Sequence, residues 1–210
     1  MISCIIPAYN EGERIKDVIF AVKNSQLIDE IIVVSDGSTD NTYEVAKSCN
    51  VTKVINLKKN IGKGGAIIEG LKYAKGEIIL LVDADLRGLN KENLEKLIKP
   101  IIENKADMTI GCNIPFVKKE YSGLRCLKRF LLEPENPQEL ERLRKSRFNI
   151  ENELNTKARK NNLKVAYIKM RGVRNIHKIK KYGLKEGLKK TIEMYSQLAS
   201  YFIKNKIKLF

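Results

Sequence analysis

The sequence is poor in the residues that build zinc sites and has no apolar run long enough to cross a membrane. Its 210 residues include one histidine and four cysteines, which are far apart and form no C-x-x-C pair. A zinc site built from cysteine and histidine is therefore excluded. No stretch approaches the roughly 20 apolar residues that span a bilayer, and the first seven residues indicate a strand rather than a secretory signal. We expect a soluble, cytoplasmic protein with reduced cysteines.

Low-complexity sequence is also absent. The composition, with 43% hydrophobic and 31% charged residues, is that of a globular chain. A chain of this length has one sizeable core by default. We predict a single domain over residues 1–210.

The positive charge lies in the second half of the chain. Residues 1–112 contain 15 Lys and Arg against 16 Asp and Glu, whereas residues 113–210 contain 25 against 9. Such a surface attracts the phosphates of nucleic acid, of anionic lipid or of a small molecule. A coding bias toward Lys, Ile and Asn is the alternative explanation, and the sequence leaves both open.

Short apolar runs alternate with helical patterns in the first half, which predicts βαβ units and a mostly parallel sheet. Strands buried on both faces are expected at residues 3–8, 30–35, 53–57 and 77–82. A first helix is expected after Asn10, which forms a capping-box spacing with Glu13. Further helices are expected from near Asp40, from residues 62–65, and over residues 90–104 with a bend at Pro100.

The second half is less regular. A strand is expected over residues 107–112, and the basic, proline-containing stretch 113–149 is predicted to cross one edge of the sheet as an irregular segment. A helix near 151–160, a strand over 164–170 and an amphipathic helix over 184–204 follow. The last helix is expected to pack on the core or on a second copy in a homodimer, with an interfacial membrane helix as the alternative.

Acidic residues follow two of the predicted strands. Asp36 follows the run 31–35, and Asp83 and Asp85 follow the run 78–82. Open α/β sheets bind ligands at the carboxyl ends of their strands. Two aspartates one residue apart point to the same side and can share a hard cation, for which Mg²⁺ or Mn²⁺ bridging two phosphates is the natural choice. One such aspartate often only starts a turn, but three beside a glycine-rich turn indicate a site.

Four segments in this order resemble the motifs of GT-A glycosyltransferases. They are CIIPAYNE at 4–11, VVSDGSTD at 33–40, NIGKGGA at 60–66 and DAD at 83–85. The glycine-rich segment has neither the P-loop nor the dinucleotide-binding spacing. The resemblance implies an α/β fold of GT-A type, with a mostly parallel central sheet, flanking helices and a C-terminal acceptor-side extension. It also implies a nucleotide-sugar half, 1–112, and an acceptor-side half, 113–210.

The resemblance implies roles for residues of the first half. The donor-binding residues would be Pro7, Ala8, Tyr9, Glu11, Asp36, Lys63 and Asp83. Within this set, Glu11 and Asp83 would bind the ribose and Asp36 would accept from the base. Lys63 would lie near the base or the diphosphate, at a helix amino terminus that favours anions. Asp85 would be catalytic by ligating the Mg²⁺ or Mn²⁺ that neutralises the leaving diphosphate.

The second half resembles the glucosyl-3-phosphoglycerate synthase-like transferases in the segments SGLR at 122–125, FNIE at 148–151 and GVR at 172–174. The implied acceptor-binding residues are Ser122, Gly123 and Arg125. Glu151 would be a second catalytic residue, acting as a base or orienting the acceptor, although a helix amino terminus also favours Glu there. His177 would be a metal ligand, and Asn175 is the alternative for that position.

These assignments predict a metal-dependent glycosyltransferase that moves a sugar from a UDP- or GDP-sugar to an anionic acceptor, a small molecule with a phosphate or carboxylate. Transfer to a polyprenyl phosphate by a protein peripheral to the membrane is the alternative. A nucleic-acid-binding protein is disfavoured because aromatic RNA-binding motifs are absent, so no nucleic acid partner is expected. A nucleotidyltransferase is disfavoured because its amino-terminal glycine-rich loop is missing.

Overall fold

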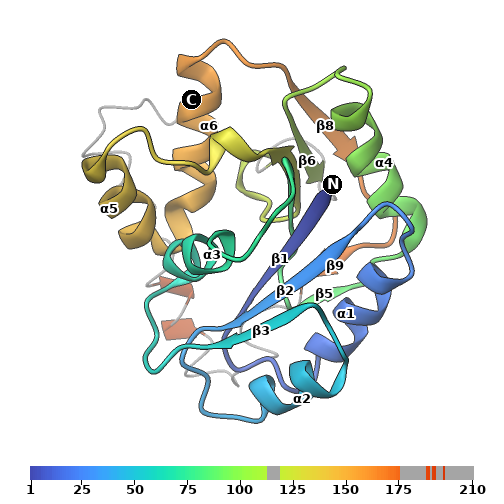
Figure 1. Cartoon of the computed structure of the whole chain (residues 1–210), viewed down its shortest axis with the longest axis vertical. Helices are drawn as coiled ribbons and strands as arrows, with labels where there is room; N and C mark the ends of the chain where they lie inside the picture. Colours follow the sequence, from blue (N-terminus) through green and yellow to red (C-terminus); the bar gives the residue numbers. More distant parts are fainter. Residues whose placement is uncertain (113–118, 176–187, 190, 193–195, 197–210) are drawn as a thin grey trace. The chain divides into compact units, whose positions relative to one another are not determined.

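A seven-stranded sheet lies between two layers of helices in the part of the chain from Met1 to Arg174 (Figure 1). Its strands, in their order across the sheet, are β3 (Lys53–Asn56), β2 (Glu30–Ser35), β1 (Ile2–Ala8), β4 (Ile78–Leu81), β7 (Arg125–Lys128), β6 (Met108–Cys112) and β8 (Val165–Lys169). The first four are parallel, and β7 is antiparallel to both β4 and β6. The predicted mostly parallel sheet is confirmed.

The computed structural model describes residues 1–112 and 119–175 and the separate positions 188, 189, 191, 192 and 196. Residues 175–210 form a unit of their own. His177 and most of the helix predicted over 184–204 lie outside the described residues. Within the described part of the chain, no helix has the length and apolar character needed to cross a membrane.

Helices cover both faces of the sheet (Figure 1). One layer consists of α1 (Ile15–Lys23), α2 (Thr42–Ser48) and α4 (Lys91–Ile102), and the other of α3 (Lys63–Leu71), α5 (Pro137–Lys145) and α6 (Ile150–Lys160). Successive residues of a strand face opposite sides. Accordingly, Cys4 and Ile6 of β1 pack in the core under α1 and α4, whereas Ile5 packs in the core under α3.

Short elements connect these layers. They are the strands β5 (Leu86–Arg87) and β9 (Arg174–Asn175), which pair with each other, and the 3-10 helices η1 (Lys119–Tyr121), η2 (Arg129–Leu131) and η3 (Arg147–Asn149). Helix η3 lies between α5 and α6 in the chain, and both α5 and η3 contact the start of α3.

The start of α1 differs from the prediction. The apolar stripe from Ile15 to Val22 is buried as expected, but α1 begins at Ile15 without a side-chain cap. The predicted capping box is wrong because Asn10 has a distant partner: its side-chain oxygen accepts from the backbone N–H of Thr39 at 2.8 Å. Side-chain caps are present instead at α4 and α5, where asparagines 90 and 136 accept from backbone N–H groups three residues on.

The prediction that the segment 113–149 is irregular is wrong for residues 119–149, which the structure describes. Strand β7 (Arg125–Lys128) is inserted between β4 and β6 rather than crossing an edge, and α5 (Pro137–Lys145) is regular. Two features explain why the sequence pattern did not predict β7 and α5. A buried arginine opens the four-residue strand, and Pro137 is the first residue of a helix, a position that proline favours.

The order of the strands decides where a ligand can bind. From β1 the chain adds β2 and β3 on one side and then returns to add β4 on the other side of β1. The strand order therefore reverses at β1, and open α/β sheets bind ligands at the carboxyl ends of the strands at such a point. We call this place, where β1, β2 and β4 end, the carboxyl edge of the sheet.

Candidate active site

The carboxyl ends of β1 and β2 are tied together by their own polar groups. The Asp36 N–H donates to the Ala8 carbonyl at 2.8 Å, and the Gly12 N–H donates to the Asp40 carboxylate at 3.1 Å. Burial raises the pKa of Asp40, but hydrogen bonds from Thr42 and Gly12 outweigh it and lower that pKa below its ordinary value. The predicted donor residues Pro7, Ala8, Tyr9 and Glu11 therefore lie on a fixed part of the edge, where Ala8 and Glu11 are buried and Pro7 and Tyr9 half-buried.

Asp36 holds the turn that leads into α3. Its two carboxylate oxygens accept from the backbone N–H groups of Ile61 and Gly62, at 2.8 and 2.9 Å. Burial raises the pKa of this carboxyl, against these hydrogen bonds and the charge of Arg147. Gly62 has a φ of 88°, which favours glycine. Asp36 thus positions Lys63, and its predicted contact with a base stays a prediction.

Lys63 joins the two halves of the chain. Its Nζ lies 2.5 Å from Asp83 Oδ1, at the end of β4, and 2.6 Å from Glu151 Oε1, in the first turn of α6. The three side chains, which we call the Lys63 cluster, are only 16%, 19% and 8% exposed for Lys63, Asp83 and Glu151. Burial lowers the pKa of Lys63, but the two carboxylates outweigh it and raise that pKa above its ordinary value. Lys63 is therefore a cation at neutral pH.

Gly123 packs directly on this cluster. A Cβ atom added at Gly123 would lie 2.2 Å from Lys63 Nζ and 2.3 Å from Asp83 Oδ2. Its neighbour Ser122 is half-buried, and the Ser122 hydroxyl accepts from the Leu124 N–H at 3.3 Å. The structure therefore brings the predicted acceptor segment against the predicted donor residues. Binding of an acceptor by Ser122 and Gly123 stays a prediction.

Arg125 lies in the interior of the protein. Its guanidinium is fully buried and donates to the carbonyls of Glu120 and Ser122 and to Asn155 Oδ1, the last at 2.7 Å. Burial lowers the pKa of Arg125, although the nearby carboxylates of Glu151 and Asp83 oppose this shift. These contacts join the segment before β7 to α6, so the geometry supports a positioning role, and acceptor binding by Arg125 is untested.

Asn155 is a residue of the site region that the sequence interpretation missed. It lies four residues after Glu151, and residues at that spacing share a helix face. This spacing was the available signal, because an asparagine inside a helix that faces the core needs a polar partner. Asn155 is 6% exposed, and its side chain also donates to the Glu120 carbonyl at 2.9 Å.

The described residues supply only part of a metal site. Among them, no three His, Cys, Asp or Glu side chains are grouped to hold an ion, and Asp83 is engaged by Lys63. Asp85 is half-buried, two residues after Asp83 at the carboxyl edge. Its carboxylate is a hard oxygen donor of the kind that Mg²⁺ and Mn²⁺ prefer, so it fits one ligand position. Asn175 belongs to β9, but its side chain and His177 are not described.

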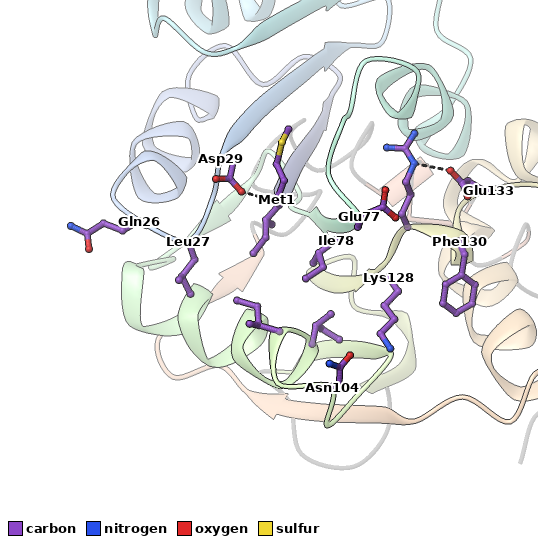
Figure 2. Close-up of a pocket in the computed structure, with 14 residues that line it drawn as sticks. Met1, Gln26, Leu27, Asp29, Glu77, Ile78, Asn104, Lys128, Phe130 and Glu133 are labelled. Carbon is purple, nitrogen blue, oxygen red and sulfur yellow. Dashed lines mark hydrogen bonds and ion pairs between the residues drawn. The ribbon is translucent and has the colours of Figure 1, made fainter.

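A hollow of about 590 Å³ lies at the other edge of the sheet (Figure 2). Its lining includes the amino ends of β1 and β4, at Met1 and Ile78, together with Lys128, Phe130 and Glu133. Parallel strands have their amino and carboxyl ends at opposite edges. The hollow is therefore separate from the Lys63 cluster.

Known proteins resemble the chain in sequence. Residues 3–178 match the model of the family described as glycosyl transferase family 2. A dolichyl-phosphate beta-glucosyltransferase of Trichomonas vaginalis is 36% identical over 145 residues, which are 60% of this chain and 42% of that protein. The UDP-N-acetylglucosamine–dolichyl-phosphate N-acetylglucosaminyltransferase of Methanococcus voltae is 35% identical over 148 residues, 61% of this chain and 58% of that protein. The matches thus span about half the length of these relatives.

Solved structures resemble the chain in fold. Glucosyl-3-phosphoglycerate synthase of Mycobacterium tuberculosis, in complex with Mn²⁺, UDP-glucose and phosphoglyceric acid, has a TM-score of 0.72 and 21% identity, covering 95% of this chain and 79% of that one. The same enzyme with Mg²⁺ and UDP has a TM-score of 0.68 and 22% identity, covering 84% and 71%. At such identity the likeness concerns the fold. The chain therefore belongs to glycosyl transferase family 2 and has the GT-A fold that its four ordered motifs predicted.

Proposed function

We propose that the protein transfers a sugar from a UDP- or GDP-sugar to an acceptor that carries a phosphate, with Mg²⁺ or Mn²⁺ as cofactor. The observation that carries the proposal is the Lys63 cluster, which joins one donor-side carboxylate, one cation and one acceptor-side carboxylate at the carboxyl edge. Solved structures of the same fold contain Mn²⁺ or Mg²⁺ with UDP, or Mn²⁺ with UDP-glucose, which supports the choice of donor and cofactor.

The residues of the site have distinct tasks in this proposal. The segment 7–11, Asp36 and Asp83 hold the nucleoside, and Lys63 contributes positive charge near the diphosphate. Asp85, with the nucleotide phosphates, would hold the ion, which when bound offsets the negative charge that develops on the leaving diphosphate. Ser122 and Gly123 line the acceptor side, and Arg125 positions them.

The chemistry of the acceptor decides what Glu151 must do. A hydroxyl acceptor has to lose a proton to attack, and the Glu151 carboxylate is placed at the acceptor side to accept it. A phosphate oxygen of a polyprenyl phosphate is already anionic and needs no base. The sequence relatives named as dolichyl-phosphate transferases favour the lipid acceptor as second candidate, whereas the phosphoglyceric acid in a structural neighbour supports a small hydroxyl acceptor.

The donor half is tested by thermal shift with UDP-glucose, UDP-N-acetylglucosamine and GDP-mannose, with and without Mn²⁺. We expect one of them to raise the Tm only with the metal, and Asp85→Ala to lose this effect while still folding, as shown by its circular dichroism spectrum. If none of the sugars, nor UDP or GDP, raises the Tm of the wild type, the proposal is wrong.

The acceptor is tested by radiolabelled transfer to phosphoglycerate in solution and to polyprenyl phosphate in detergent micelles. Glu151→Gln is expected to reduce transfer to a hydroxyl by about 10²–10⁴-fold, as loss of a general base does. Transfer to a lipid phosphate should fall less than about tenfold, because no proton has to be removed. Loss of transfer to both acceptors by more than a hundredfold would contradict this assignment of Glu151.

A further inference from the structure

Lys63 forms ion pairs with two carboxylates that belong to different halves of the chain. The Lys63 ammonium lies within 2.6 Å of both Asp83 and Glu151. Glu151 is 88 residues away in sequence and is fixed on α6, while Lys63 is the first residue of α3. The ammonium sits on four flexible methylene groups, so it can move between partners while both helices stay in place.

A bound nucleotide would compete with Glu151 for the ammonium group of Lys63. A diphosphate at the carboxyl edge would present several anionic oxygens, of which the Mg²⁺ or Mn²⁺ ion would occupy only some. The remaining oxygens would accept charge-assisted hydrogen bonds from Lys63. Glu151 is 8% exposed, so it would be costly to leave without any positive charge nearby. Arg125 supplies that charge, since its buried guanidinium interacts electrostatically with both Glu151 and Asp83.

We propose that Glu151 and the diphosphate of the nucleotide compete for the ammonium group of Lys63, so that donor binding releases the Glu151 carboxylate toward the acceptor. This inference rests on the proposed function, because it requires that the site binds a nucleotide diphosphate. Lys63 is then a positioning residue for Glu151. The acceptor-side carboxylate is held by Lys63 until a donor is present.

The test is isothermal titration of UDP and of GDP, each with Mn²⁺, into wild-type protein and variants. Glu151→Gln keeps the size of the side chain but removes the charge that competes for Lys63. It should bind the nucleotide about three- to tenfold more tightly, because less of the ion-pair energy is lost on binding. Lys63→Met should bind it more weakly than wild type. In the Lys63→Met background, Glu151→Gln should give no gain.

Two further variants make the result decisive. Glu153→Gln removes a carboxylate from the same turn of α6, one that pairs with Arg142 at 2.8 Å, and should leave nucleotide affinity unchanged. Glu151→Asp shortens the side chain and draws the carboxylate away from Lys63, so it should also tighten binding if Glu151→Gln fails to fold. Unchanged or weaker binding by both Glu151 variants, or a gain that persists without Lys63, would overturn the competition. Failure of the wild type to bind UDP or GDP would overturn the proposed function as well.

Discussion

Replacing Gly123 by alanine tests the packing of the Lys63 cluster with a single added methyl group. The new Cβ would lie 2.2 Å from Lys63 Nζ and 2.3 and 2.6 Å from the two Asp83 carboxylate oxygens. Real Cβ contacts are never this short, so the ammonium or the carboxylate has to move. Gly123 has no positive φ, so the backbone accepts alanine without strain and the effect is steric.

The loss of stability and of UDP affinity can be estimated from the steric overlap. Overpacking costs about 1–3 kcal/mol, and for a chain of this size each kcal/mol lowers the Tm by about 2–4 °C. We therefore expect Gly123→Ala to lower the Tm by about 2–12 °C. UDP binding should weaken by about tenfold, on the order of 1.4 kcal/mol, because the added methyl group pushes the Lys63 ammonium and the Asp83 carboxylate away from the positions in which the proposed site would bind the nucleotide.

Scanning calorimetry and UDP titration with Mn²⁺ measure both effects. The matched control is Gly76→Ala, whose Cβ would lie 2.6 Å from Ser3 Oγ near the amino ends of the strands. It should lower the Tm at least as much, because its Cβ would also lie 2.7 Å from the backbone carbonyl oxygen of Met1 and 2.8 Å from the backbone nitrogen of Ser3, and it should leave UDP affinity unchanged. In a Lys63→Met background, Gly123→Ala should lower the Tm by less, because methionine lacks the ammonium group that the new methyl group would meet. An alanine variant with the Tm and UDP affinity of wild type would refute the close packing of Gly123 on the ion pair.

Two other predictions follow from the buried polar groups. Arg125→Lys should reduce the free energy of unfolding, measured in urea, by about 2–4 kcal/mol, because an ammonium cannot reach the Glu120 and Ser122 carbonyls and Asn155 together; retention of wild-type stability would count against this network. Asp40 has a lowered pKa in the folded state, so its stabilisation is present above pH about 4 and is lost as the pH falls through the folded pKa. Asp40→Asn should therefore lower the Tm of the protein at pH 7 and change it little at pH 2. Circular dichroism during thermal unfolding measures the Tm at both pH values.

The βαβ part of the fold was predictable because its signals are local. A strand buried on both faces is an apolar run, and a helix on a sheet has a regular apolar stripe, as in α1 and α4. Strand β7 gave no such signal. It has four residues and begins with Arg125, whose burial depends on Asn155, thirty residues further along the chain.

The site was predictable as a place but not as a set of contacts. Strand ends located Asp36 and Asp83, and the motifs located Lys63 and Glu151. Nothing local indicates that Lys63 bridges Asp83 to Glu151, because that contact depends on how α6 packs against α3. Similarly, nothing local indicates that both oxygens of Asp36 accept from the 61–62 backbone, and its contact with a base stays a prediction. Long-range packing decided these roles.

The positive charge of the second half is partly internal, which changes its interpretation. Lys157 is 8% exposed and donates to the Glu133 carbonyl at 2.6 Å while pairing with Glu139 at 3.2 Å. Arg125 is also buried. Each of these cations stabilises the packing of α6 rather than attracting anions from solvent, so net charge overstates the attraction of this half for phosphate. If the acceptor is anionic, as proposed, selectivity for it must therefore come from the few charges that border the carboxyl edge, of which the Lys63 ammonium is held between both halves of the chain.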